Sequence, residues 1–118
     1  MPNTGITLLL DLYDCQSSAL KNDAILEQLF TSALQFGGLE VVDQIGQQLP
    51  DQHTTHIFLL KESHATIHTW QENGRVVVDV YAIGSPETVR PALEIIRGFL
   101  TQKLIARAAQ AQLIERGA

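Results

Sequence analysis

Residues 61–70, KESHATIHTW, bring a serine and two histidines within six positions of one another. The Ser63 hydroxyl is a candidate nucleophile, and imidazoles such as those of His64 and His68 ionise near neutral pH, which suits them to proton transfer. The sequence has no G-x-S-x-G elbow, so the pattern gives poor support to a serine hydrolase. In a regular strand Ser63 and His68 would point to opposite faces, and a turn or kink after Ser63 would be needed to bring them together.

Histidine is also a common zinc ligand, and the chain has four histidines: His53, His56, His64 and His68. Their spacing matches no established zinc motif, so we predict no metal site. From the local pattern alone, the simplest interpretation of the segment is a surface serine beside solvated histidines.

Hydrophobic patterning predicts the elements that would position these residues. Residues 5–15 form a buried-strand pattern, and apolar side chains recur at helical spacing over residues 22–36. Asn22 or Asp23 can cap that helix, and the glycine pair at 37–38 ends it. Further strand patterns occur at residues 39–49, 55–63, 64–71 and 75–84, with turn signals at Pro50-Asp51 and in QENG.

A second helix is expected to begin at Ser85, with Pro86 in its first turn and a buried face of Val89, Leu93, Ile96 and Leu100. The tail, residues 104–118, is ambiguous between a continued helix and a final strand. The expected order is β-α-β-β-β-α with an uncertain last element. Consecutive strands between two helices favour an α+β two-layer sandwich, an antiparallel sheet with both helices packed on one face. A second subunit is a natural cover for the other face.

The composition is that of one globular domain spanning residues 1–118, with 45% hydrophobic and 18% charged residues. The net charge is −5 and no basic run occurs, which argues against nucleic-acid binding. The single cysteine, Cys15, cannot form an internal disulfide. Residues 1–15 lack a signal-peptide pattern, and no segment reaches the roughly 18 apolar residues of a membrane span. We therefore expect a cytoplasmic protein with no membrane partner.

The segment ESHATIHTWQENG resembles the E-S-H-x-[ST]-I-H-T-W-P-E pattern of the prokaryotic S-adenosylmethionine decarboxylases, small pyruvoyl enzymes of polyamine (spermidine) biosynthesis. The resemblance continues upstream through LYDC and the helix of residues 22–36, and downstream into VDVYAIG. It covers roughly residues 5–103. The Glu-Ser-His core and the Ile-His-Thr-Trp run, at fixed spacing, make the resemblance specific.

The resemblance implies that Ser63 is a self-cleavage site. Its hydroxyl would attack the carbonyl of Glu62, and elimination would separate a β chain, residues 1–62, from an α chain, residues 63–118, that begins with a pyruvoyl group. His68 matches the family's processing histidine, which removes the proton that drives elimination. Thr55 keeps the hydroxyl of a serine that assists processing. The pyruvoyl ketone would form a Schiff base with the substrate amine and serve as the electron sink for decarboxylation, without a separate cofactor.

Two positions depart from the family pattern. Ile83 replaces the cysteine of a TCG segment, the family's proposed proton donor, and an isoleucine cannot donate a proton. Leu49 replaces a phenylalanine that stacks on adenine, at a loss of about 0.5–1.5 kcal/mol. Glu72 matches an acid that binds the ribose hydroxyls. The residues assigned to substrate binding are Glu72, Leu49, His64 and Asp11; Cys15 is expected to serve packing.

These departures leave three functions open. S-adenosylmethionine is the leading substrate, in a homodimer of processed protomers such as relatives form. An L-ornithine or L-arginine decarboxylase of the same family is the first alternative, and its cationic substrate would need a carboxylate from Asp11, Glu72 or Asp79. Asp79 is expected to have a structural role instead, or to pair with Arg75. The second alternative is an unprocessed, non-catalytic homologue that acts as a partner or binding subunit.

Overall fold

The computed structural model describes residues 4–117. Residues 1–3 and residue 118 of the expected domain lie outside the described residues, and so does the start of the segment that lacks a signal-peptide pattern. Residues 4–117 form six strands, two α-helices and one 3-10 helix. Their bounds are β1 Gly5–Tyr13, η1 Ser18–Lys21, α1 Asp23–Phe36, β2 Val41–Leu49, β3 His53–Leu60, β4 His64–Trp70, β5 Arg75–Ile83, α2 Pro86–Lys103 and β6 Ala108–Arg116.

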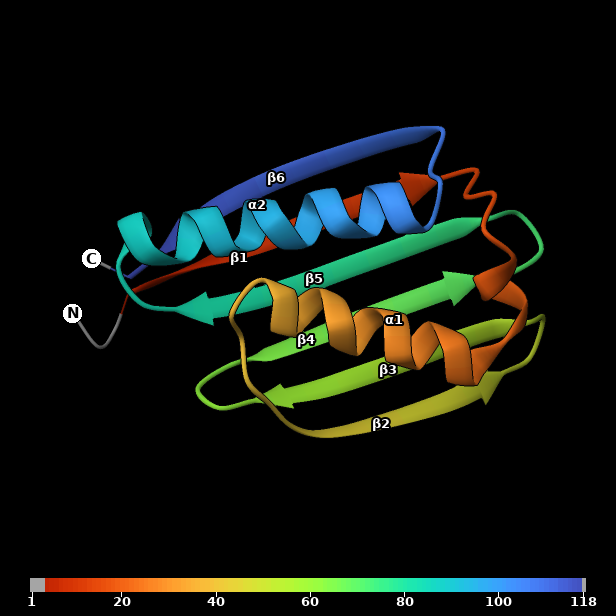
Figure 1. Cartoon of the computed structure of the whole chain (residues 1–118), viewed down its shortest axis with the longest axis horizontal. Coiled ribbons are helices and arrows are strands. Elements are labelled where there is room, and N and C mark those ends of the chain that lie inside the picture. The colour runs from red at the N-terminus through yellow and green to blue at the C-terminus, as the bar shows by residue number, and fades with distance from the viewer. Residues whose placement is uncertain (1–3, 118) are drawn as a thin grey trace.

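The six strands form one sheet in the order β2-β3-β4-β5-β1-β6, and every neighbouring pair is antiparallel. Figure 1 shows α1 and α2 side by side across one face of this sheet. The expected α+β two-layer sandwich, with both helices on one face, is confirmed.

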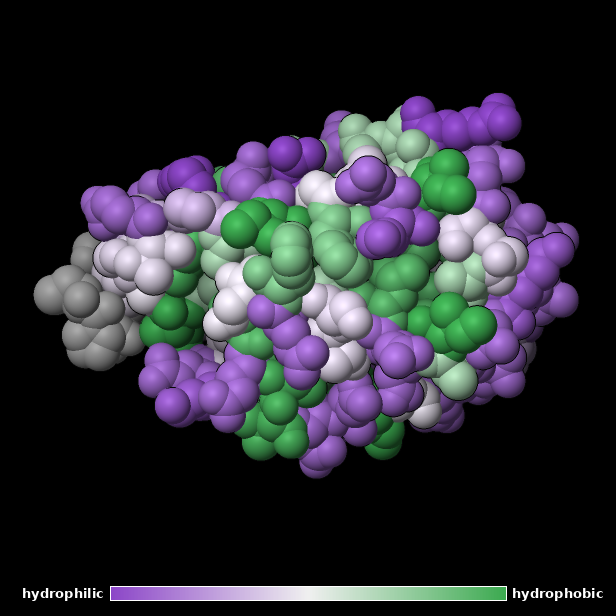
Figure 2. Space-filling model, in the orientation of Figure 1, coloured by the Kyte–Doolittle hydropathy of each residue, from purple (hydrophilic) through white to green (hydrophobic). Residues whose placement is uncertain are grey.

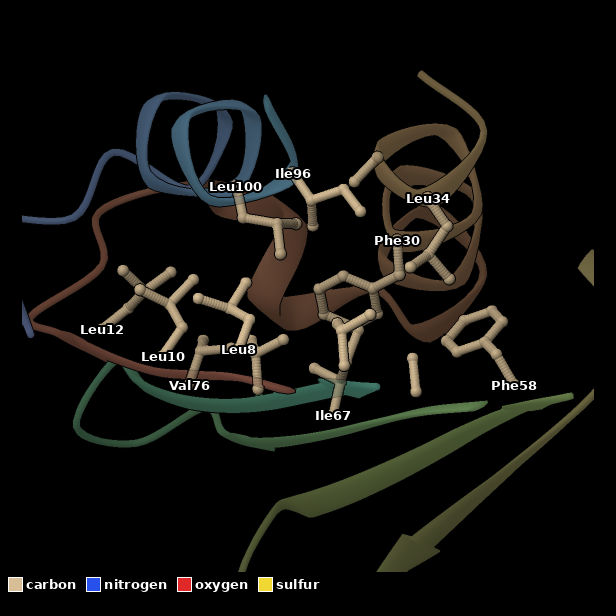
Figure 3. Packing of buried hydrophobic residues seen from close by; sticks show 14 of the residues in the cluster. Leu8, Leu10, Leu12, Phe30, Leu34, Phe58, Ile67, Val76, Ile96 and Leu100 are labelled. Carbon is tan, nitrogen blue, oxygen red and sulfur yellow. The ribbon is translucent and has the colours of Figure 1, made fainter. Parts of the chain in front are cut away.

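The core lies between the sheet and the helices. Side chains alternate along each strand, so Leu8, Leu10 and Val76 turn toward the helices and are buried. Figure 3 shows them facing Phe30 of α1 and Leu100 of α2. Each such side chain contributes about 1.5–3 kcal/mol when it is fully buried, so this layer holds the helices on the sheet.

Local signals set the helix ends largely as expected. The Asn22 side chain accepts a hydrogen bond from the Ile25 backbone N–H at 3.1 Å and caps α1, and the buried residues of this helix follow the predicted rhythm. Ile25 itself is 50% exposed, because it lies about 100° around the helix from the buried Leu26. Ser85 occupies the N-cap of α2 but makes no side-chain cap hydrogen bond. The buried face of α2 is the predicted one: Val89, Leu93, Ile96 and Leu100.

One expectation about the strands needs correction, and one open alternative is resolved. Four strands lie between the helices where the expected order has three, because the chain reverses at residues 61–62 and makes two strands of the segments on either side. The tail is strand β6, not a continued helix. It pairs with β1 from Gly5↔Arg116 to Tyr13↔Ala108, which satisfies the backbone of a strand that would otherwise form an open edge.

The two faces of the sheet differ in cover. Figure 2 views the helix-bearing face, where polar side chains lie among apolar patches. No helix within residues 4–117 covers the opposite face, and three of its larger apolar side chains, Ile45, Ile57 and Leu59, are exposed. In residues 4–117, neither helix has the length and apolarity that crossing a membrane requires.

Candidate active site

Ser63 lies directly after the tight turn between β3 and β4. The Leu60 backbone N–H donates to the Ser63 carbonyl oxygen at 2.9 Å, which leaves Lys61 and Glu62 as the exposed two-residue loop. The chain therefore turns before Ser63. After it, β4 pairs regularly with both neighbours from His64 to Trp70, without the kink that would fold His68 back toward Ser63.

A cavity of about 250 Å³ opens beside this turn. The α1–β2 connection forms one wall, and the Lys61 backbone N–H donates to the Glu40 carbonyl oxygen there at 3.0 Å. Ile83, at the end of β5, lies in the same lining as Ser63. The lining residues are Gly38, Leu39, Glu40, Leu60, Lys61, Glu62, Ser63 and Ile83. The position at which the resemblance implies a cysteine is thus next to the candidate cleavage site.

His68 lies on the uncovered face of the sheet, in a polar cluster with β3. Its Nδ1 is 3.1 Å from Thr55 Oγ1 and 3.1 Å from His53 Nε2. The His53 ring stacks on Trp70 with centroids 4.3 Å apart and an interplanar angle of 14°. Burial, and then the nearby His53, lower the pKa of His68 below its ordinary value. His68 is therefore biased toward its neutral form, which is the form that accepts a proton.

The structure does not bring Ser63 and His68 together within one chain. They are five residues apart on an extended strand, which corresponds to about 16 Å, and alternation points their side chains to opposite faces. His64 is nearer to Ser63, on the uncovered face, with its ring centroid 6.0 Å from that of Tyr81. Of the two histidines in the motif, the one matched to processing is the more distant.

The other candidate substrate residues gather near His68. Leu49 and Thr55 line a second cavity of about 260 Å³ on the uncovered face. Glu72 is exposed in the β4–β5 turn, and that turn meets the β2–β3 turn through a hydrogen bond from the Gln71 N–H to the Gln52 carbonyl oxygen at 3.2 Å. Figure 1 shows the β4–β5 turn and the β3–β4 turn that precedes Ser63 at opposite ends of the sheet.

Asp11 is engaged by an arginine. Its Oδ1 accepts a hydrogen bond from Arg75 Nη2 at 2.7 Å, and the Arg75 guanidinium lies 4.4 Å from the centroid of the Tyr13 ring. The expected pairing of Arg75 with Asp79 is therefore wrong. Four residues along a strand span about 13 Å, so these two side chains share a face without meeting. A neighbouring strand brings Asp11 to Arg75 instead.

The four histidines do not converge on one site. His56 is 2% exposed on the helix side of β3, edge-on to Phe30, whereas His53 and His68 lie on the uncovered face. Burial lowers the pKa of His56, and Glu27 and Asp23 of α1 partly oppose that shift. A Cβ at Gly46 would lie 2.9 Å from the His56 ring, so the glycine leaves room for it.

Cys15 is buried in the core, as expected for a packing residue. Burial, with the charge of Asp14, raises the pKa of its thiol to about 11. A thiol in this state is a weak nucleophile and a poor acid near neutral pH. Cys15 therefore does not supply the proton donor that the resemblance implies at position 83.

Sequence reasoning missed the contact between His53 and His68. The sequence signal that could have found this contact is the pairing register of β3 and β4. Once the β3–β4 turn is placed at Lys61 and Glu62, counting outward pairs Thr55 with His68 and His53 with Trp70, as the structure has them.

Comparison with known proteins decides the family. The family model described as S-adenosylmethionine decarboxylase matches residues 6–117. The chain belongs to the S-adenosylmethionine decarboxylase family. The S-adenosylmethionine decarboxylase proenzyme of Prochlorococcus marinus is 37% identical over 99 residues, which are 84% of this chain and 79% of that protein. The proenzyme of Thermoplasma volcanium is 30% identical over 113 residues, 96% of this chain and 84% of that protein.

The fold agrees with this family. The crystal structure of the adenosylmethionine decarboxylase from Aquifex aeolicus matches all of this chain and 94% of that one, with a TM-score of 0.81 and 27% sequence identity. The resemblance first inferred from ESHATIHTWQENG is confirmed. It places the chain in a family of decarboxylases that are made as proenzymes.

Proposed function

We propose that the chain is a self-processing proenzyme that decarboxylates S-adenosylmethionine for polyamine biosynthesis. The observation that carries the proposal is the position of Ser63. The Glu62–Ser63 peptide bond lies at an exposed two-residue turn, with Ser63 lining a cavity. This placement fits a bond that must be reached and broken without disturbing the strands on either side.

The chemistry of processing balances with the residues at the turn. Attack of Ser63 Oγ on the Glu62 carbonyl exchanges the peptide C–N bond for an ester. Loss of the Ser63 Cα proton and breakage of its Cβ–O bond then release Glu62 as a carboxylate. Hydrolysis of the remaining enamine consumes water and releases ammonia, which leaves pyruvoyl at the start of the α chain.

The sheet order supports survival of the fold after cleavage. Residues 4–62 provide β1, β2, β3 and α1, while the rest of the chain provides β4, β5, α2 and β6. Because β1 lies between β5 and β6, the two products interleave within one sheet. Cutting the turn removes only a connection, and the pairing between β3 and β4 remains.

The residues around Ser63 fit a small keto group. The 250 Å³ cavity has room for the pyruvoyl and the reacting end of a substrate, and its charged lining residues are Glu40, Lys61 and Glu62. When present, the pyruvoyl group supplies the electron sink for decarboxylation. The apolar side chain of Ile83 would exclude water from one side of this cavity, and it provides no proton.

We propose that the active form is a homodimer, because the candidate residues form two separate halves. Ser63 and Ile83 lie at one end of the sheet, while Leu49, Thr55 and His68 lie on the uncovered face toward the other end. A two-fold axis that packs two uncovered faces together could bring the His68 end of one sheet over the end of the partner's sheet at which the β3–β4 turn lies. It would also cover the exposed apolar side chains of that face.

In this arrangement His68 removes the Ser63 Cα proton, and Thr55 holds the His68 ring through its hydroxyl. Leu49 packs against the adenine and Glu72 accepts hydrogen bonds from the ribose hydroxyls. His64, beside Ser63, contacts the substrate near the reacting carbon. Asp11 is less suited to a cationic substrate than its sequence position suggests, because Arg75 already neutralises its carboxylate.

Mass spectrometry of the purified protein tests the proposal. We expect two chains that meet between residues 62 and 63, with pyruvoyl at the new end, and a single intact chain for Ser63→Ala. Release of labelled carbon dioxide from S-adenosylmethionine, and not from L-ornithine or L-arginine, tests the substrate. Release from the basic amino acids alone would favour the first alternative. A wild-type chain that stays intact under all conditions would instead identify a non-catalytic homologue, the alternative that Ile83 raises.

A further inference from the structure

We propose that His53 is a positioning residue for His68, which holds the proton of the neutral His68 ring on Nδ1 and leaves Nε2 free to accept a proton. The inference rests on the proposed function, in which His68 is the base of self-cleavage. It adds a residue that lies outside the ESHATIHTW motif and acts through His68 on the adjacent strand.

The geometry of the cluster supports this role. His53 Nε2 and Thr55 Oγ1 are each 3.1 Å from His68 Nδ1, so both contacts converge on the same ring nitrogen. The His53 ring is stacked 4.3 Å from the Trp70 ring, and the His68 ring lies 6.0 Å from it at 21°. Stacking on the large indole restricts rotation of His53, which keeps its Nε2 directed at His68.

The tautomer follows from the hydrogen bond. A neutral imidazole carries one N–H, and the partner of one ring nitrogen decides which nitrogen holds the proton. If His68 Nδ1–H donates to His53 Nε2, the lone pair of His68 is on Nε2, the nitrogen turned away from β3. A bond in the opposite direction would place the His68 proton on Nε2 and remove its capacity as a base there.

The other charged groups around His68 are more distant or already paired. On β5, Asp79 and Arg75 share its face at diagonal positions, about 7–8 Å away. Arg75 is paired with Asp11 of β1. On β4, Thr66 and Trp70 flank His68 and carry no charge. In residues 4–117, His53 is therefore the titratable group in direct contact with the His68 ring.

Histidine NMR on the Ser63→Ala chain tests the inference without requiring cleavage. In this parent we expect neutral His68 to carry its proton on Nδ1. His53→Ala should reduce the population of that tautomer, because His68 Nδ1 loses the acceptor 3.1 Å away. His53→Gln should retain the tautomer, because its amide oxygen is an acceptor.

A matched control removes another imidazole from the same face of β4. His64 lies four residues from His68, about 13 Å along the strand, so His64→Gln should leave the His68 tautomer unchanged. A proton on Nε2 in the parent would overturn the proposal. An unchanged tautomer in His53→Ala would also overturn it, since Thr55 alone would then hold the ring.

The rate of self-cleavage provides a second readout. Chains with Ser63 intact, made by cell-free synthesis and followed during cleavage, should be slowed about tenfold or more by His53→Ala and less by His53→Gln. If His53→Ala and His53→Gln slow cleavage equally, the acceptor at position 53 has no effect, which would show a purely structural role and contradict the proposal. If the wild-type chain never cleaves, the proposed function fails, while the NMR comparison still decides the role of His53.

Discussion

Ser63 and Ile83 line the same cavity, although they are twenty residues apart in the sequence. The β4–β5 hairpin brings them together, because His64 pairs with Tyr81 and the flanking residues meet just beyond that pair. An isoleucine side chain has no exchangeable proton. The cavity that holds the candidate cleavage site therefore has an apolar wall where relatives are expected to carry a thiol.

Restoring that thiol should increase decarboxylation. Ile83→Cys places an acid in the lining of the Ser63 cavity, and general acid catalysis contributes about 10²–10⁴-fold where it operates. We expect the rate of carbon dioxide release from S-adenosylmethionine to rise by about tenfold or more. This is below the full range for an acid catalyst, because the introduced thiol is not optimally placed. The rate of self-cleavage, measured by mass spectrometry, should change little.

Ile83→Val is the control for this experiment, because it enlarges the cavity by one methyl group without adding an acid. If the valine and cysteine variants release carbon dioxide at equal rates, the thiol has no role in this protein. The proton donor would then be another group at the site.

Two inactive chains should complement each other if the active site is shared between protomers. Chains that carry Ser63→Ala keep His68, and chains that carry His68→Ala keep Ser63. Each alone should remain intact. When the two are co-expressed with different tags, up to about half of the His68→Ala chains should be cleaved, since random pairing puts about half of them in mixed dimers.

The complementation has an internal control in the Ser63→Ala/His68→Ala chain, which should rescue nothing. Absence of cleavage in the mixture, with mixed dimers confirmed by tag pull-down, would mean that Ser63 and His68 act within one chain. The folded chain would then have to rearrange by about 16 Å to bring them together.

The ion pair between Asp11 and Arg75 should stabilise the fold only modestly. The two side chains are 33% and 37% exposed, so solvent screens their attraction. In a double-mutant cycle of Asp11→Asn and Arg75→Gln on the Ser63→Ala chain, we expect a coupling free energy of about 0.2–1 kcal/mol by urea denaturation. A larger coupling would mean that this face is less solvated than the protomer suggests, as in a tight dimer.

His56 should make the free energy of unfolding depend on pH. Burial lowers its pKa in the folded chain below the ordinary 6.5, so below that pH the unfolded chain binds more protons than the folded one. The contribution is fully present above pH 6.5 and is lost as the pH falls toward the folded pKa. The slope should not exceed about 1.4 kcal/mol per pH unit.

Urea denaturation of the Ser63→Ala chain between about pH 5 and 7.5 measures this dependence. His56→Phe should remove the part of the pH dependence that comes from His56. Phenylalanine keeps a ring against Phe30 and eliminates the buried Nδ1, which makes no hydrogen bond in residues 4–117. The free energy of unfolding of the His56→Phe chain should thus rise relative to that of its parent as the pH falls. Identical pH profiles for the two chains would show that His56 does not titrate on unfolding.

Local patterns predicted the elements that depend on neighbouring residues. The buried face of α2, the Asn22 cap and the turn at QENG follow from spacing and side-chain chemistry within a few positions. Gly74 illustrates this: it closes that turn at φ 67°, and a Cβ there would lie 2.8 Å from the Cys15 backbone nitrogen. The motif around Ser63 predicted the family for a similar reason, because the spacing of its residues is itself the signal.

Tertiary structure decided the relationships between distant segments. Ala108–Arg116 is rich in residues that favour helices, yet it is strand β6, because β1 offers an unpaired edge along its whole length. Arg75 meets Asp11 across strands and not Asp79 along its own. The sequence by itself thus determined the family and the local elements. Only the register of the sheet decided that His68 contacts His53 and lies far from Ser63, because strand pairing joins residues that no local pattern connects.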